Sequence, residues 1–218
     1  MKKGMKILVL AAVCVFVLMA GSSQAALVSG KIWTITGYNE TTHDLTVTPA
    51  TVPLATFTVD AINFDSEALT GSYSGLVTYT QFLSNSLSGA PGPNTLVWNS
   101  GLSTFQNQTM ITDNTNTSLF QLTGTASFPA DMAIRHDDGF YLILGATSYD
   151  FSHPTSPETA YLHNAAGDYN FTLNYAAWNT FPEVLQVPGI RPVPIPAAAW
   201  LLGSGLIGLV AIRRRMKK

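Results

Sequence analysis

The sequence predicts an all-β fold: an antiparallel β-sandwich of the jelly-roll type, flanked by an N-terminal signal helix and a single C-terminal transmembrane helix. Three observations predict the sandwich. Aromatic and β-branched residues alternate with polar ones along several short segments, as in strands with one buried face. Clusters of Gly, Pro, Ser and Asn separate these segments, which is typical of turns. No stretch between the terminal segments keeps a helical apolar repeat over three turns.

Five segments of the body, which we place at residues 26–187, have the alternation expected of strands. The clearest turn cluster, SGAPGPN at residues 88–94, lies between the third and the fourth of them. No internal repeat is present, so the segments predict one domain rather than an array. The five are residues 31–38 (KIWTITGY), 55–64 (ATFTVDAINF), 74–83 (SGLVTYTQFL), 118–128 (SLFQLTGTASF) and 168–178 (DYNFTLNYAAW).

Residues 1–25 have the three parts of a secretory signal peptide. A basic start precedes an apolar core at residues 7–20, and small residues follow it up to Ala25. We expect export by the Sec translocase and cleavage by signal peptidase between Ala25 and Ala26; the alternative is a retained N-terminal anchor. The only cysteine, Cys14, lies in this segment, so the processed chain would have neither a disulfide nor a thiol nucleophile.

The charge of the body is strongly acidic. Residues 26–190 contain all thirteen acidic residues of the chain and only two basic ones, Lys31 and Arg135, which gives a net charge of −11. A body with this charge repels phosphate backbones, so nucleic-acid binding is excluded as a function. Cation binding is compatible with it.

The C-terminal part predicts a membrane span. Residues 195–212 contain no charged residue, and eighteen helical residues reach about 27 Å, enough to cross the hydrocarbon of a bilayer. We expect a Pro-rich linker at residues 188–192 and a transmembrane helix at about 196–212. Basic tails stay cytoplasmic, so the body would lie on the periplasmic side of the inner membrane. The tail consists of Arg213, Arg214, Arg215, Lys217 and Lys218.

A short motif precedes this span. In order, the motif residues are Val193, Pro194, Ile195, Pro196 and Ala197. Motif, apolar span and basic tail together resemble the PEP-CTERM class of bacterial sorting signals, in the variant with Val-Pro-Leu-Pro-Ala. The resemblance implies that an exosortase-type transpeptidase cleaves near the motif and that the body reaches the cell surface or the medium. The two prolines resist helix formation, so this segment would stay extended and accessible to a protease. The alternative is a single-span anchor that is never cleaved.

The most informative segment of the body is residues 131–151, DMAIRHDDGFYLILGATSYDF. Residues 132–136 and 140–144 have the pattern of strands, and Asp138-Gly139 predicts a hairpin turn between them. This order, followed by the Ala-Gly-Asp-Tyr loop and aromatic strand at residues 165–178, resembles the second half of the β-sandwich domain of anthrax protective antigen and yeast flocculins.

In the lectin-type members of that family an adjacent Asp-Asp pair holds calcium that bridges to sugar hydroxyls. Asp137 and Asp138 match that pair here, and hard Ca²⁺ ions prefer carboxylate and carbonyl oxygens. Asp168 and Asn164 are further candidate ligands. The alternative is that Asp138-Gly139 makes a tight turn and Asp137 is solvated. Side chains that can stack on sugars, or else belong to the core, are Trp98, Tyr175 and Trp178.

Together these features favour an exported, non-enzymatic protein of the bacterial envelope or extracellular matrix, with exopolysaccharide or a biofilm as candidate partner. The first alternative is a calcium-dependent carbohydrate-binding module of the lectin or adhesin type. The second is a surface glycan hydrolase. It has the least support, because no pair of carboxylates is singled out as acid and nucleophile.

Overall fold

The structure, a computed structural model, describes residues 28–36, 45, 51–66, 77–85, 94–100, 103–112, 116–153, 156–178 and 182–193. All of them belong to one compact unit, Ala26–Val193. The expected signal peptide with Ala25 and Ala26, the motif residues from Pro194 onward, the expected span and the basic tail lie outside the described residues. Within the described part, no helix is long and apolar enough to cross a bilayer.

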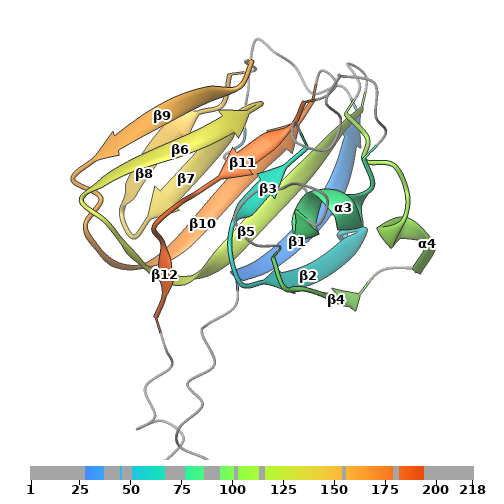
Figure 1. The fold of residues 1–218 in the computed structure, drawn as a ribbon, viewed down its shortest axis with the longest axis horizontal. Helices are drawn as coiled ribbons and strands as arrows, with labels where there is room; N and C mark the ends of the chain where they lie inside the picture. Colours follow the sequence, from blue (N-terminus) through green and yellow to red (C-terminus); the bar gives the residue numbers. More distant parts are fainter. Residues whose placement is uncertain are drawn as a thin grey trace, which may run out of the picture. The chain divides into compact units, whose positions relative to one another are not determined.

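The predicted β-sandwich is confirmed, with every strand pair antiparallel (Figure 1). An eight-stranded sheet has the order β4-β2-β1-β5-β10-β7-β8, and β12 pairs with β5. A four-stranded sheet has the order β3-β11-β6-β9. The strands of the large sheet are β1 (Val28–Thr36), β2 (Ala55–Val59), β4 (Leu96–Ser100), β5 (Asn116–Phe128), β7 (Phe140–Leu144), β8 (Thr147–Phe151), β10 (Gly167–Ala177) and β12 (Arg191–Pro192). Those of the small sheet are β3 (Asn63–Asp65), β6 (Asp131–Asp137), β9 (Glu158–His163) and β11 (Val184–Gln186).

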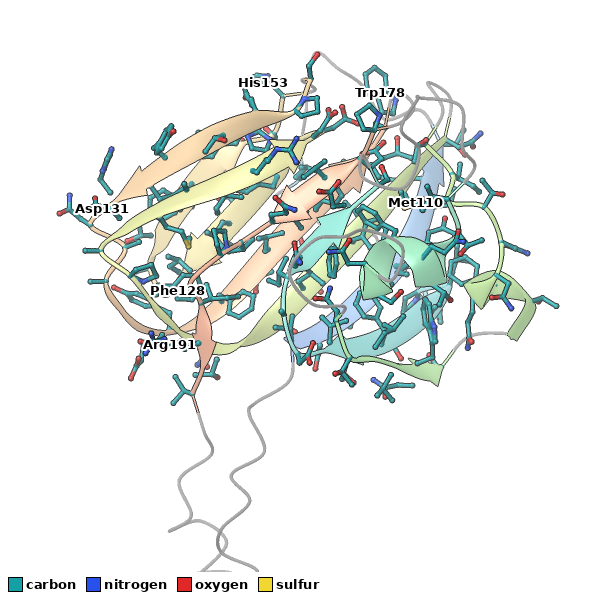
Figure 2. All side chains as sticks on the ribbon, in the orientation of Figure 1. Met110, Phe128, Asp131, His153, Trp178 and Arg191 are labelled. Carbon is teal, nitrogen blue, oxygen red and sulfur yellow. The ribbon has the colours of Figure 1, made fainter. Side chains whose placement is uncertain are left out.

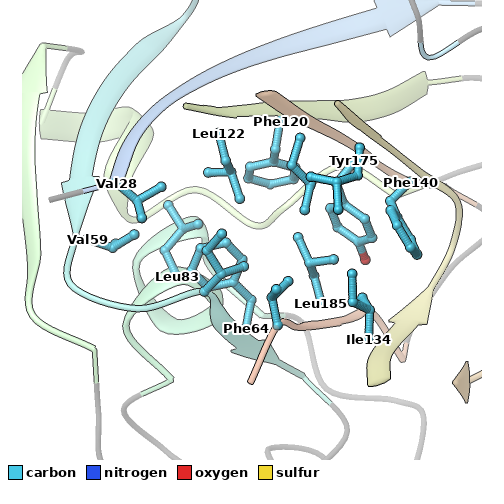
Figure 3. Close-up of a cluster of buried hydrophobic side chains, with 14 of the residues drawn as sticks. Val28, Val59, Phe64, Leu83, Phe120, Leu122, Ile134, Phe140, Tyr175 and Leu185 are labelled. Carbon is cyan, nitrogen blue, oxygen red and sulfur yellow. The ribbon is translucent and has the colours of Figure 1, made fainter. Parts of the chain in front are cut away.

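The core lies between the two sheets. Figure 3 shows Phe64, Ile134 and Leu185 of the small sheet facing Phe120 and Tyr175 of the large one. All five are fully buried. They alternate with outward-facing residues along their strands, as the period of two requires when one face of each sheet is buried.

The segment at residues 74–83 is not a strand as predicted. Its described part, from residue 77, leads into helix α3 (Tyr79–Ser84), and a second short helix, α4 (Ser103–Gln106), follows β4. A capping box begins α3: the Thr78 hydroxyl accepts from the Gln81 N–H, and the Gln81 side chain accepts from the Thr78 N–H. The Thr-x-x-Gln spacing is a helix-start signal, and here it prevails over the apparent alternation.

The predicted hairpin at Asp138-Gly139 is also wrong. Strand β6 lies in the small sheet, between β11 and β9, whereas β7 lies in the large sheet, between β10 and β8. Asp138 and Gly139 therefore carry the chain from one sheet to the other. The inward residues of both strands, among them Ile134 and Phe140, meet in the shared core instead of lying side by side in one sheet.

The expected linker at residues 188–192 is only partly a linker. Its last two residues form β12, in which Arg191 pairs with Ser127 and Pro192 with Ala126. The N–H of Val193, the first residue of the expected sorting motif, donates to the Thr125 carbonyl at 3.2 Å. The large sheet thus extends to the start of the expected motif. The pairing of β1 with β5 ends at Ser29 and Thr123. The backbone groups of β5 beyond Thr123 therefore remain for β12 to pair with.

Candidate ligand site at Asp137 and Asp138

Asp137 and Asp138 lie where the chain crosses between the sheets, and both are buried. Only 5% of Asp137 and 2% of Asp138 are exposed, and the peptide bond between them is cis. Buried carboxylates are costly unless their environment holds them. The solvated turn aspartate considered from the sequence is therefore not what the structure contains.

Three groups hold the main chain and one carboxylate of this pair. The Tyr175 hydroxyl donates to the Asp137 carbonyl. Nδ1 of His136 lies 2.7 Å from the Asp138 carbonyl oxygen. The Trp178 N–H donates to Oδ2 of Asp138 at 2.6 Å. The partners come from β6 and from the end of β10, so strands of both sheets fix the turn.

Gly139 is required by close packing. A Cβ atom at this position would lie 2.5 Å from the carbonyl carbon and oxygen of Ser152, closer than any side-chain carbon can approach. The Gly139 carbonyl also accepts from the Ala176 N–H at 3.1 Å. The glycine predicted as a turn residue instead lets the chain pass directly against the backbone that follows β8.

A third carboxyl group, Glu183, lies beside the pair and is 0% exposed. Burial raises its pKa well above the ordinary value, and the negative charge of Asp138 raises it further. Both effects favour the neutral acid. Its Oε2 lies 2.9 Å from the Tyr175 hydroxyl. The Tyr175 hydroxyl has one proton, which it donates to the Asp137 carbonyl. The neutral Glu183 acid can therefore donate its own proton to the Tyr175 hydroxyl oxygen.

Glu183 is fixed through its main chain by Ser66, at the end of β3. The Ser66 N–H donates to the Glu183 carbonyl at 2.9 Å. The Glu183 N–H donates to the Ser66 hydroxyl at 2.6 Å. Sequence reasoning missed Glu183, because these partners are separated by 117 residues and the surrounding Pro-rich stretch has no clear alternation.

His136 completes the polar surroundings of the pair. Burial lowers its pKa below the ordinary value, which favours the neutral imidazole that donates from Nδ1 to the Asp138 carbonyl. Its ring contacts Phe140 edge-on at a centroid distance of 4.8 Å. Arg135, the basic residue of β6, lies 3.6 Å from Oδ2 of Asp65. The charge around Asp137 and Asp138 is thus dominated by carboxyl groups.

The structure does not bring Asp168 and Asn164 to this site. Asn164 follows His163, which pairs with Asp131 at the other end of β6 from Asp137. Asp168 pairs with Ser127 near the start of β10, whereas Tyr175, near its end, pairs with Phe140. Figure 2 shows Trp178 and Phe128 at opposite ends of the sandwich. Seven residues of strand separate Asp168 from Tyr175, about 23 Å.

The candidate sugar-stacking residues belong to the core. Tyr175 is 0% and Trp178 5% exposed. Trp98 is half-buried against Phe57 and Phe105, with ring centroids 5.8 and 6.4 Å away. None of the three offers an open ring face at the Asp pair, so a sugar would have to be held there by polar contacts.

The donor chemistry of the site suits a hard cation only in part. Two carboxylates and nearby carbonyl oxygens are ligands that Ca²⁺ prefers. In the described ranges, however, no group of three or more His, Cys, Asp or Glu side chains has the arrangement of a metal site. The remaining oxygens would have to come from the backbone or from a ligand.

Two solved structures are similar to this chain. One is a PA14 sugar-binding domain from an RTX adhesin, with 14% sequence identity, a TM-score of 0.41, and 75% of this chain and 87% of that chain covered. The other is the PA14 domain of the MpAFP antifreeze protein, with 13% identity, a TM-score of 0.46, and 78% and 87% covered. No protein-family model matches the sequence, and no curated protein matches it.

Proposed function

We propose that the chain is an exported carbohydrate-binding module of the bacterial envelope, without catalytic activity, which holds a calcium ion at Asp137 and Asp138 when it binds sugar. One observation carries the proposal. Two adjacent carboxylates are buried in a turn that both sheets hold, and their charge contributes to raising the pKa of Glu183. Burying that much negative charge is favourable where a cation is bound.

The roles of the residues follow from their chemistry. Asp137 and Asp138 would supply carboxylate oxygens to the ion, while Tyr175, His136 and Trp178 hold the turn in place. A bound calcium ion supplies positive charge and open coordination positions that neighbouring sugar hydroxyls can occupy. Specificity would then come from the loops around the turn, as is usual for sites on a rigid scaffold.

The terminal segments support the location. We propose that the Sec translocase exports the chain, that the span anchors it in the inner membrane, and that an exosortase-type transpeptidase then processes it at Val193–Ala197. The body would reach the surface or the extracellular matrix, where exopolysaccharide is its candidate partner. This part of the proposal rests on the distribution of charge along the chain, in which an acidic body lies between two basic ends.

The test is glycan-array binding of the full chain, purified in detergent, with calcium and with chelator. We expect binding that the chelator abolishes and that Asp138→Asn weakens at least about tenfold, because a lost ligand carboxylate costs metal affinity. The matched control is Asp131→Asn, which removes an exposed carboxylate at the other end of the same strand. Binding that is unchanged by chelator and by Asp138→Asn would refute the calcium site.

A further inference from the structure

The peptide unit between Asp137 and Asp138 is held at both of its polar atoms by one pair of side chains. The Tyr175 hydroxyl donates to its carbonyl oxygen. The N–H of Asp138 hydrogen-bonds to the Glu183 carboxyl. The hydroxyl and the carboxyl are themselves 2.9 Å apart, so carbonyl, hydroxyl, carboxyl and N–H form a closed ring of contacts.

Neither member of the pair has room to move. Both residues are 0% exposed. The Tyr175 ring stacks on Phe82 of α3 at a centroid distance of 6.3 Å and packs against Phe120 of β5 at 5.9 Å. The main chain of Glu183 is hydrogen-bonded in both directions to Ser66. The ring is therefore anchored in the large sheet on one side and in the small sheet on the other.

Packing alone does not explain why Tyr175 and Glu183 occupy the core. Fully burying a carboxyl group costs more than burying an apolar side chain of similar volume. Phe and Leu at the two positions would fill similar space, but they would leave the carbonyl of Asp137 and the N–H of Asp138 without these partners. What the pair provides beyond packing is the placement of that peptide unit.

We propose that Tyr175 and Glu183 are positioning residues for the calcium site: they fix the Asp137–Asp138 peptide unit so that both carboxylates are already arranged for the ion. This inference rests on the proposed function. Calcium ligands must converge to about 2.3–2.6 Å from the ion, and a site held in place before binding avoids the entropy of ordering its ligands. Neither residue touches the ion; each acts through the backbone of the pair.

The test compares calcium affinity with stability in two tyrosine variants of the full chain in detergent. Tyr175→Phe removes the hydroxyl that holds Asp137. The matched control, Tyr79→Phe, removes another fully buried hydroxyl, which lies 2.8 Å from the Ser118 hydroxyl. We expect both variants to unfold at a lower temperature in chelator. Only Tyr175→Phe should weaken Ca²⁺ binding, by about 10- to 100-fold, as is usual when the support of a metal ligand is removed.

A second pair of variants keeps the inference testable if Tyr175→Phe does not fold. Glu183→Gln retains an oxygen that can accept from the Asp138 N–H and should bind Ca²⁺ nearly as the wild type does. Glu183→Leu retains neither contact and should lose affinity like Tyr175→Phe. Wild-type affinity in Tyr175→Phe or in Glu183→Leu would overturn the positioning role alone. A wild-type chain that binds no Ca²⁺ would overturn the calcium site and the positioning role together, so the two failures are distinguishable.

Discussion

The two ends of strand β10 differ in how their residues are buried. From Gly167 to Leu173 buried or half-buried inward residues alternate with outward ones, whereas the four residues from Asn174 to Ala177 are all buried. The outer face of this second part is covered, because the Asn174 side chain donates to the Leu45 carbonyl and Ala176 packs with Leu45. Where both faces of a strand are covered, polar groups enter the interior and must be bonded there. The candidate site lies at that covered end.

The largest difference in stability between the two ends should appear when the close-packed glycine at each end is replaced by alanine. Gly139→Ala places a Cβ 2.5 Å from the Ser152 backbone, which shifts less easily than a side chain, and should lower the free energy of unfolding by about 3 kcal/mol. Gly124→Ala, opposite Phe171 in the other half of β10, meets a ring atom at 3.1 Å and should cost about 1 kcal/mol or less, since it also restricts the unfolded chain. Urea unfolding measures both values, and equal losses would contradict the difference in packing.

A smaller contrast is expected between the two tyrosines of β10. Tyr175→Phe removes the buried hydroxyl that donates to the Asp137 carbonyl and lies 2.9 Å from Oε2 of Glu183, and it should cost about 2 kcal/mol of unfolding free energy. Tyr169→Phe removes an exposed hydrogen bond of 3.0 Å to the Ala166 carbonyl. Its cost should be about 0.5 kcal/mol. Thermal unfolding in chelator measures the stability of both variants. A larger loss of stability in Tyr169→Phe than in Tyr175→Phe would contradict the prediction.

The last expected effect is a slope rather than a single free energy: a change in how stability depends on pH. The folded state raises the pKa of Glu183, so it binds a proton that the unfolded chain releases as the pH rises above about 4.5. Stability from this group is therefore present below that pH and is lost as the pH rises toward the folded-state value, by at most about 1.4 kcal/mol per pH unit for one proton. Glu183→Gln should remove this slope in chelator. An unchanged slope between pH 5 and 8 would show that the carboxyl is ionised in the folded protein.

Sequence reasoning succeeded where one face of a strand is solvated. Strand β1 and the first part of β10 follow the predicted segments because their alternation reflects one buried face. Strand β5 also follows its predicted segment, although residues 117–120 are all buried. It also placed Asp137 and Asp138 at the end of a strand. It missed α3, whose start depends on the capping box of Thr78 and Gln81 rather than on periodicity. The single strand predicted at residues 55–64 is also wrong, because residues 55–59 form β2 of the large sheet and residues 63–65 form β3 of the small sheet.

The surroundings of the Asp pair could not be predicted because distant segments make them. The main chain of Glu183 is held beside the pair by Ser66, which lies 117 residues earlier. The Trp178 N–H donates to the Asp138 carboxylate, which lies 40 residues earlier. The path of Gly139 between the sheets depends on Ser152, whose backbone contact no local pattern encodes. A turn signal such as Asp-Gly indicates that the chain bends, but not whether it returns to the same sheet.

Anomalous diffraction from crystals grown with Ca²⁺ would locate the ion itself. We expect an anomalous peak about 2.3–2.6 Å from carboxylate oxygens of both Asp137 and Asp138, and no such peak in crystals of Asp138→Asn. A wild-type map with no peak at this turn, at calcium concentrations that support sugar binding, would contradict the proposed calcium site.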